Sequence, residues 1–232
     1  MNDIRFVWFD LDDTLLDHKG AELLALEALV ARHGTLFGDA SLSDVRNAYA
    51  RVNRQVWTEY AAGVRDKTST KYGRFELLLL DVHPDGKENT VLLADEYLRL
   101  YASFWNWVEG AREALIRMAE HYPVGLMTNG FTEVQHAKLQ RFPELSRACS
   151  HIVISEETGV LKPDVRIFRH AEELCGHTGE HVLYIGDSLS SDVTGGIGAG
   201  WYVAWFHGDD HPSPRVFSFR QWSDLLAKLL DV

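Results

Sequence analysis

The sequence has little cysteine and no long apolar run, and each absence narrows the class of protein. Its 232 residues include two cysteines, Cys149 and Cys175, which form no CxxC pair. So sparse a set argues against structural disulfides and favours the reducing environment of a cytoplasm. No window approaches the roughly 18 apolar residues that a membrane helix needs, and the opening stretch MNDIRFVWFD lacks the features of a secretory signal. We therefore expect a cytoplasmic protein with no membrane partner.

Acidic residues outnumber basic residues, and this imbalance limits the kinds of molecule that the protein is expected to bind. The chain has 23 Lys and Arg against 34 Asp and Glu, a formal net charge of −11. Because nucleic-acid polymers are bound through basic residues that neutralise phosphates, we expect no such partner. A small phosphorylated molecule requires only a local positive site, so the net charge leaves this class of ligand open.

Five apolar runs predict the strands of a parallel sheet. Most of them are continuously hydrophobic rather than alternating, which is typical of parallel strands covered on both faces. Helical stretches separate the last four runs, and such alternation of strand and helix is the pattern of an α/β fold. We therefore predict a Rossmann-like, doubly wound parallel sheet. The runs lie at residues 4–9, 124–127, 151–155, 182–186 and 201–206.

The first two runs are separated by about a hundred residues, far more than one crossover connection requires. A helix predicted over 109–122 would make that crossover. The residues before it, 18–106, read as several helices, one of which repeats apolar residues at helical spacing. We predict a core domain of residues 1–17 and 107–232 and an inserted helical domain of residues 18–106.

Acidic and polar residues gather where three of the predicted strands end. The segment DLDDT (10–14) follows the first strand, TNG (128–130) the second and GDSLSSD (186–192) the fourth. The carboxyl ends of parallel strands meet at one edge of the sheet, where ligands bind. We expect these segments to converge on a single site.

The aspartates of these segments predict a metal site. In an extended segment Asp10 and Asp12 point to the same side, and Asp187 and Asp192 would lie near them. Their mutual repulsion is tolerable if a cation lies among them, and hard oxygen ligands favour Mg²⁺ together with a phosphate oxygen. We expect Asp187 to bind Mg²⁺ and Asp192 to orient the site or bind through a water molecule.

If the ligand beside this metal is a phosphoryl group, roles can be predicted for the remaining residues. Asp10 is the predicted nucleophile, which forms an acyl-phosphate, and Asp12 is the predicted general acid and base. Thr128 and the backbone N–H of Asn129 are expected to donate hydrogen bonds to the phosphoryl oxygens. Lys162 supplies a positive charge opposite the transferred group and also binds the phosphate.

These motifs resemble those of a known family. In this order and at these strand ends, DLDDT, TNG, KP and GDSLSSD look like the four motifs of the haloacid dehalogenase superfamily of phosphatases, and the insert resembles the α-helical (C1-type) cap of one subclass. The resemblance implies that Asp10 and the backbone carbonyl of Asp12 also bind Mg²⁺. Dehalogenases and phosphonatases of the superfamily lack an aspartate two places after the nucleophile, so Asp12 favours hydrolysis of phosphate esters. In the KP motif we expect Pro163 in the first turn of the next helix, with Lys162 extended toward the site.

A narrower resemblance indicates a substrate class. The stretches VNRQVWTEYAAG and GRFELLL in the insert, with TNGFTEVQHAKLQR and ISEETGVLKPDVRIF in the core, are similar to the bacterial pyrimidine 5′-nucleotidases of this superfamily. The similarity implies hydrolysis of dUMP, dTMP, UMP and modified analogues. The alternative is a phosphatase or mutase for sugar phosphates or other small phosphometabolites, and a haloacid dehalogenase or a non-catalytic binding protein is disfavoured. The sequence is compatible with a monomer or a homodimer.

The cap of such an enzyme would cover the base and sugar while the phosphate stays in the core. Asn53, Trp57 and Tyr60 share one face of a predicted helix, on which Trp57 would stack on a base and Asn53 would read its polar edge. Arg74 and Phe75 form a second pair of candidates. The competing interpretation is that these aromatic residues form the core of the cap.

Overall fold

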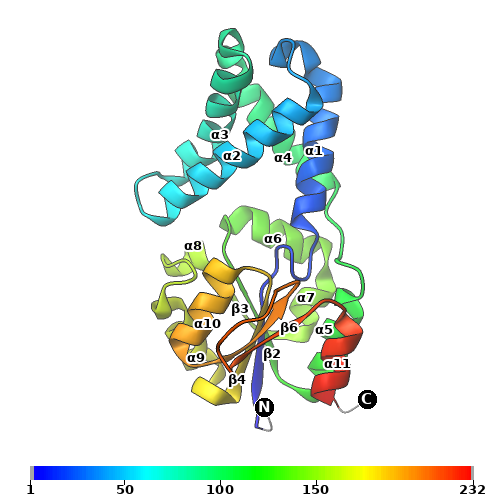
Figure 1. Ribbon diagram of the computed structural model, residues 1–232, viewed down its shortest axis with the longest axis vertical. Helices are drawn as coiled ribbons and strands as arrows, with labels where there is room; N and C mark the ends of the chain where they lie inside the picture. Colours follow the sequence, from blue (N-terminus) through cyan, green and yellow to red (C-terminus); the bar gives the residue numbers. More distant parts are fainter. Residues whose placement is uncertain (1–2, 231–232) are drawn as a thin grey trace. The chain divides into compact units, whose positions relative to one another are not determined.

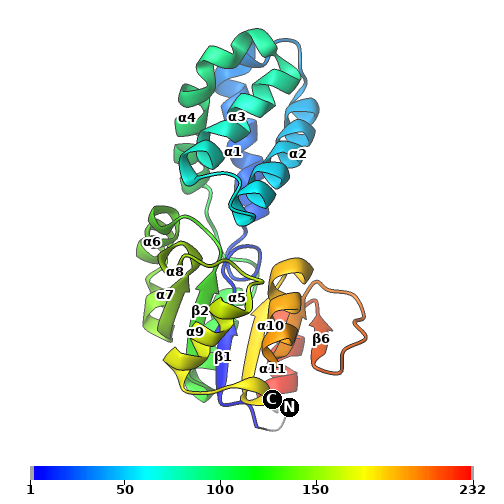
Figure 2. The same cartoon turned by 90° about the vertical axis from the view of Figure 1, so that its left-hand side faces the viewer.

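The computed structural model describes residues 3–230, which divide into two compact units. Residues 3–17 and 107–230 contain the sheet and are called the core unit; residues 18–106 are built of helices and are called the helical unit. Both are drawn in Figures 1 and 2. None of the helices in this described part of the chain has the length and apolar composition to cross a membrane.

The core unit is built on a six-stranded sheet with the order β3-β2-β1-β4-β5-β6, in which every pair of neighbours is parallel. The predicted doubly wound α/β fold is confirmed. The strands are β1 (Phe6–Phe9), β2 (Val124–Thr128), β3 (Cys149–Ile154), β4 (Val182–Gly186), β5 (Tyr202–Phe206) and β6 (Val216–Phe219).

Helices cover both faces of this sheet, with α9 and α10 on one face and α5 and α11 on the other (Figure 1). They provide the second and third layers that bury the strands on both sides. The helices of the core unit are α5 (Ala111–His121), α6 (Thr132–Arg141), α7 (Pro143–Ala148), α8 (Ser155–Thr158), α9 (Val165–Cys175), α10 (Thr194–Ala199) and α11 (Trp222–Leu230). One 3-10 turn lies at Gly179–His181, and a π-helical turn lies at Leu189–Val193.

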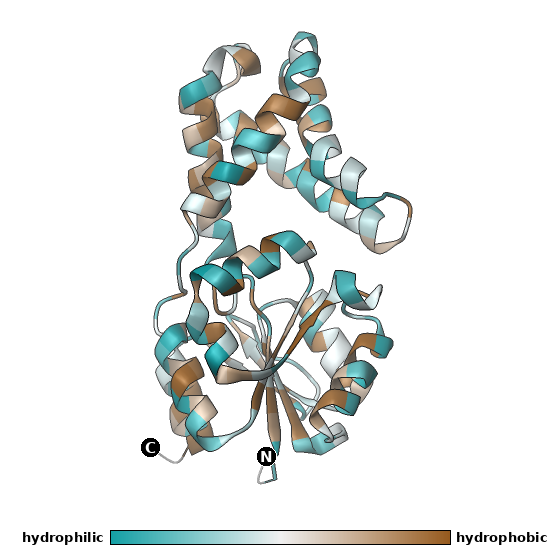
Figure 3. Cartoon of the chain, turned by 180° about the vertical axis from the view of Figure 1, so that it is seen from behind, coloured by the Kyte–Doolittle hydropathy of each residue, from teal (hydrophilic) through white to brown (hydrophobic). Residues whose placement is uncertain are grey.

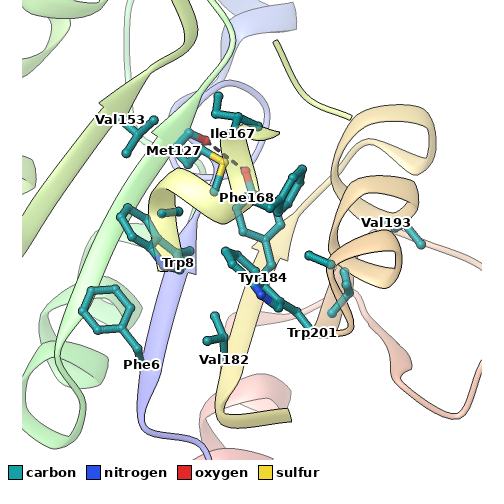
Figure 4. Close-up of a cluster of buried hydrophobic side chains, with 13 residues drawn as sticks. Phe6, Trp8, Met127, Val153, Ile167, Phe168, Val182, Tyr184, Val193 and Trp201 are labelled. Atoms are coloured by element: carbon teal, nitrogen blue, oxygen red, sulfur yellow. Dashed lines mark hydrogen bonds between the residues drawn. The ribbon is translucent and has the colours of Figure 1, made fainter. Parts of the chain in front are cut away.

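The first strand is buried on both faces, as its continuous hydrophobicity predicts. Phe6 and Trp8 pack on one face in a cluster that includes Phe168 of α9 (Figure 4). Phe9 faces the other side, where its ring stacks on Trp222 of α11 with the centroids 6.4 Å apart. Figure 3 shows the central strands in the colour of hydrophobic residues. Burial of this strand fixes the position of the polar segment that follows it.

The sequence does not predict the edge strand β6. Its four residues pair in parallel with β5, and only Phe219 among them is buried. The strand follows Pro212 and Pro214, which are typical of loops. A short, half-exposed strand beside prolines therefore leaves no apolar run to mark it.

Pro163 is not in the first turn of α9, contrary to the prediction. The helix begins at Val165, and Asp164 is its N-cap, with a side-chain oxygen that accepts a hydrogen bond from the backbone N–H of Arg166 at 2.9 Å. Pro163 precedes this cap, and its peptide bond with Lys162 is cis. The helix begins later because an aspartate side chain satisfies an unpaired backbone donor of the first turn, which proline does not do.

The helical unit packs its helices around aromatic side chains. Ser41 caps α2 in a reciprocal capping box, and Asp66 caps α3. The rings of Tyr49, Phe75 and Tyr97, from three different helices, lie 5.2 to 5.7 Å apart. The helices are α1 (His18–His33), α2 (Leu42–Ala61), α3 (Lys67–Val82) and α4 (Thr90–Ser103), with 3-10 turns at Gly34–Phe37 and Pro84–Asn89 (Figure 2).

Candidate active site

Asp10 and Asp187 follow the two strands at which the order of the sheet reverses. The strand β1 pairs with β2 on one side and with β4 on the other, and Phe9 lies opposite Ile185 in the register of β1 and β4. In open α/β sheets the crevice outside such a switch point is where ligands bind. The topology thus brings together two aspartates that are far apart in the sequence.

Asp192 joins them in a cluster of three carboxylates, each offering an oxygen within 4.8 Å of the others. Residue 186 is glycine, and a Cβ there would lie 2.4 Å from Asp192 Oδ2. Burial raises the pKa of Asp10 well above its usual value. The Lys162 ammonium opposes this rise, whereas the charges of Asp192 and Asp187 add to it. This crowding of like charges would be relieved by a cation.

The ammonium group of Lys162 lies against this cluster. Its Nζ donates to Asp10 Oδ1 at 2.6 Å and to Asp192 Oδ1 at 2.8 Å, and the lysine side chain is 2% exposed. The hydroxyl oxygen of Tyr184 accepts at 2.7 Å, and the backbone oxygen of Met127 lies at 3.2 Å. Each of the three ammonium protons therefore has an acceptor, which fixes the charge in place.

Two side chains support this lysine in ways that the sequence does not predict. Tyr184 donates its hydroxyl proton to the backbone oxygen of Met127 at 2.9 Å, the dashed line in Figure 4, and so presents a lone pair to Lys162. Asn129 exchanges two hydrogen bonds of 2.9 Å with the backbone of Lys162. The sequence does offer one indication of the role of Tyr184, which is a tyrosine in an otherwise aliphatic buried strand. A buried hydroxyl usually has a hydrogen-bond partner.

The second oxygen of Asp10 is held by Thr14. The threonine hydroxyl is buried and donates to Asp10 Oδ2 at 3.1 Å. The turn between them includes Asp13, whose φ of 64° lies in the left-handed region that aspartate tolerates. Both carboxylate oxygens of Asp10 are thereby fixed by hydrogen bonds.

Asp12 is held by side chains of α6. Its Oδ1 accepts a hydrogen bond from Lys138 at 2.5 Å, and its Oδ2 accepts one from Gln135 at 2.9 Å. Gln135 also donates to Thr128 Oγ1 at 3.2 Å. Neither Lys138 nor Gln135 was predicted. Their spacing of three positions on one helix is the signal that places them on a common face.

The helical unit holds the other predicted contact residues. Asn53 Nδ2 donates to Glu22 Oε1 at 3.2 Å, while Asn53 Oδ1 is buried and has no hydrogen-bond partner within residues 3–230. The rings of Trp57 and Tyr60 meet edge to face, with centroids 5.6 Å apart. Their place on one helix is consistent with the shared face that was predicted.

Phe75 is not available to a substrate, which corrects the prediction. Its side chain is completely buried between Tyr49 and Tyr97. The ring stabilises the helical unit, as the competing interpretation of these aromatic residues holds. Arg74 beside it is also buried, with its guanidinium 5.1 Å from the centroid of the Tyr97 ring.

Comparison with models of known protein families identifies the family to which the chain belongs. The family model of the haloacid dehalogenase-like hydrolases matches residues 4–200. The chain belongs to this family. It is therefore a hydrolase, as its motifs predict, and the aspartate at position 12 together with its full-length relatives makes it a phosphoric monoester hydrolase.

Two relatives and one solved structure illustrate the range of this hydrolase family. The pyrimidine 5′-nucleotidase YjjG of Escherichia coli is 30% identical over 233 residues, covering 96% of this chain and 98% of the relative. A glyceraldehyde 3-phosphate phosphatase of Pyrococcus abyssi is 30% identical over 207 residues, covering 88% of this chain and 81% of the relative. The crystal structure of the HAD-hydrolase YfnB of Bacillus subtilis, bound to magnesium, superposes with a TM-score of 0.79 at 28% identity and covers 97% of this chain and 98% of that one.

Proposed function

We propose that this hydrolase is a Mg²⁺-dependent 5′-nucleotidase that removes phosphate from pyrimidine nucleoside monophosphates through an aspartyl-phosphate on Asp10. The observation that carries the chemistry is the setting of Asp10, a buried carboxylate held by Lys162 and Thr14 with a second acid, Asp12, two residues further on. The substrate class is supported by the similarity to YjjG along nearly the whole of both chains.

The donor set fits Mg²⁺. Asp10, Asp187 and Asp192 offer carboxylate oxygens within 4.8 Å of one another, and hard oxygen donors of this kind suit the ion. We assign the ion to Asp10, Asp187 and the backbone carbonyl of Asp12, with Asp192 beside them. When bound, Mg²⁺ offsets the repulsion among the carboxylates and polarises the phosphoryl oxygens. The magnesium bound in the YfnB structure supports the choice of this ion.

In the first step a carboxylate oxygen of Asp10 attacks phosphorus, and the bond from phosphorus to the ester oxygen breaks. Asp12 gives its proton to that departing oxygen, so the nucleoside leaves as an alcohol. Lys162 stabilises the negative charge on the phosphoryl group, and the hydroxyl of Thr128 and the backbone N–H of Asn129 donate hydrogen bonds to its oxygens.

In the second step water attacks the phosphorus of the aspartyl-phosphate. Asp12, now ionised, takes the proton of that water, and the bond between Asp10 and phosphorus breaks. Phosphate leaves and the carboxylate of Asp10 is restored. One carboxyl group serves as acid and then as base, so it must keep its position through both steps.

We assign recognition of the base to the helical unit acting as a lid. Trp57 offers a ring for stacking. Asn53 Oδ1, which has no hydrogen-bond partner in the described part of the chain, is an acceptor that suits the imide N–H of uracil or thymine. Arg74 Nε, which is buried and has no hydrogen-bond partner among residues 3–230, is a further donor in the same unit.

A substrate screen tests this proposal. With Mg²⁺ present we expect kcat/KM for dUMP, dTMP or UMP to exceed that for sugar phosphates by at least about tenfold, or roughly 1.4 kcal/mol of transition-state binding. Asp10→Asn should abolish hydrolysis, and Asp209→Asn, a change in an exposed loop, should not. Robust turnover by Asp10→Asn would refute the nucleophile, and a preference for sugar phosphates would refute the assigned substrate.

A second candidate substrate is a small sugar phosphate such as glyceraldehyde 3-phosphate. The observation in its favour is the 30% identity to the phosphatase of Pyrococcus abyssi. The two candidates share the chemistry of the core unit and differ in what the helical unit must cover. Inclusion of this ester and of purine nucleotides in the screen separates them.

A further inference from the structure

Lys138 and Gln135 lie on α6, and both reach the carboxylate of Asp12. Lys138 Nζ is 2.5 Å from Asp12 Oδ1, and Gln135 Nε2 is 2.9 Å from Asp12 Oδ2. The lysine side chain is 2% exposed, while that of Asp12 is 22% exposed. A buried ammonium group is costly unless its protons have acceptors, and the oxygen of Asp12 is one acceptor that offsets the cost of burying this lysine.

Gln135 ties the same carboxylate to a second residue of the site. The two protons on its Nε2 are directed to Asp12 Oδ2 and, at 3.2 Å, to Thr128 Oγ1. The reversed amide would place its oxygen against the carboxylate, so the interaction with Asp12 selects this orientation. Because the Thr128 hydroxyl oxygen accepts from Gln135, its own proton is left for a phosphoryl oxygen.

The glycine of the TNG motif makes room for this arrangement. A Cβ at residue 130 would lie 2.1 Å from Gln135 Nε2 and 2.8 Å from its Cδ. Gly130 has no positive φ that would itself require glycine. A side chain at this position would therefore displace the Gln135 amide from Asp12 and Thr128.

We propose that Lys138 and Gln135 are positioning residues, which hold the Asp12 carboxyl group in the orientation needed to pass a proton to the leaving oxygen and to receive one from water. The bonds from Lys138 and Gln135 reach different oxygens of the carboxylate, so together they fix the orientation of the group. Gln135 at the same time orients the Thr128 hydroxyl toward the phosphoryl group. The inference rests on the proposed function, in which Asp12 is the acid and base.

The test compares two phosphate esters that differ in their need for a general acid. Deoxyuridine monophosphate releases an alkoxide, which requires a proton, whereas p-nitrophenyl phosphate releases a stable phenolate. General acid catalysis contributes about 10²–10⁴-fold, so we expect Lys138→Met and Gln135→Leu to lower kcat for the nucleotide by about tenfold or more. For the aryl ester the loss should be less than about threefold, with KM and the Mg²⁺ half-saturation unchanged.

Matched variants separate positioning from a general loss of structure. Lys138→Arg keeps the charge-assisted hydrogen bond and should recover most of the nucleotide activity. Gly130→Ala should reproduce the selective loss seen with Gln135→Leu. Arg112→Met removes an ion pair with Glu144 elsewhere in the core unit and should change neither activity. Circular dichroism and thermal unfolding check that each variant is folded. If Lys138→Met does not fold, the activities of Lys138→Arg and Gly130→Ala test the positioning role instead.

Asp12→Asn is the reference variant. Like the Lys138 and Gln135 variants, it should lose more activity on the nucleotide than on the aryl ester. In the double variant Asp12→Asn/Lys138→Met the loss should not exceed that of Asp12→Asn alone, because both changes remove one function. Equal losses on the two esters in the Lys138 and Gln135 variants, or additive losses in the double variant, would overturn the inference and leave the proposed function standing. A wild type that hydrolyses neither ester, or an Asp12→Asn variant without selectivity, would defeat the proposed function itself and this inference with it.

Discussion

Gly186 and Gly130 each lie against a polar side chain of the site. A Cβ at 186 would fall 2.4 Å from an oxygen of Asp192, and one at 130 would fall 2.1 Å from the amide nitrogen of Gln135. Neither glycine has a positive φ, so space and not backbone conformation requires glycine at these positions. At the residue scale, the glycines of the motifs leave room for the polar side chains of Asp192 and Gln135.

We predict that Gly186→Ala lowers both Mg²⁺ affinity and kcat by about tenfold or more, since displaced ligands or their supporting groups typically cost that much. The methyl group would push the Asp192 carboxylate away from Asp10 and Lys162. Gly198→Ala is the matched control, because a Cβ there meets no atom of residues 3–230 within 4 Å. Steady-state phosphate release over a range of Mg²⁺ concentrations measures both constants, and a normal Mg²⁺ dependence in Gly186→Ala would contradict the packing argument.

The residues that the sequence predicts are those whose role follows from topology. Asp10 and Asp187 come directly after apolar runs, so a parallel sheet must bring them together whatever the side-chain details. Tyr184 and Gln135 were not predicted, because a tyrosine in a strand and a glutamine on a helix are ordinary residues of those elements. Their roles depend on where a hydroxyl and an amide point, which only the packed structure defines.

At the scale of elements, helix ends are set by side chains that satisfy backbone donors. The α2 helix begins after Ser41, whose hydroxyl accepts from the backbone N–H of Asp44 at 3.2 Å, while the Asp44 carboxylate accepts from the backbone N–H of Ser41 at 2.9 Å. The sequence predicts the central strands, and most of the helices between them, from their apolar patterns. The edge strand β6 and the start of α9 depend on local pairing and capping, and both differ from the prediction.

We expect Ser41→Ala to lower the free energy of unfolding of the helical unit by about 1 kcal/mol, because it leaves a backbone donor of the first turn without its partner. Denaturant unfolding followed by circular dichroism measures the change. Ser146→Ala, on the exposed side of α7, is the control and should stay within about 0.5 kcal/mol of wild type. A loss in Ser41→Ala no larger than in this control would show that the capping box does not stabilise α2.

At the scale of the whole molecule, the residues proposed as catalytic acids, phosphate-binding groups and metal ligands all belong to the core unit. The residues assigned to base recognition all belong to the helical unit. In the proposed function, chemistry and specificity are therefore carried by separate parts of the chain. The proposed metal should stabilise the core unit alone, because the acids that would hold it lie there.

We predict that Mg²⁺ raises the midpoint of the core unit's thermal unfolding, by an amount that corresponds to about 2.7 kcal/mol at a concentration of about one hundred times Kd. Asp187→Asn should lose this shift, since it removes a carboxylate of the cluster, whereas the exposed Asp209→Asn should keep it. Differential scanning calorimetry with and without the ion gives the result. A wild-type unfolding midpoint that does not change when Mg²⁺ is added would contradict the assigned metal site.

The most direct test of the proposed chemistry is to trap the covalent intermediate. Rapid acid quenching of the enzyme during turnover of a nucleoside monophosphate, followed by borohydride reduction and peptide mass spectrometry, reports which side chain carried the phosphoryl group. We predict conversion of Asp10 to homoserine, with no such product in Asp10→Asn. Phosphate release without any modification at Asp10, or with the label on another residue, would contradict the account.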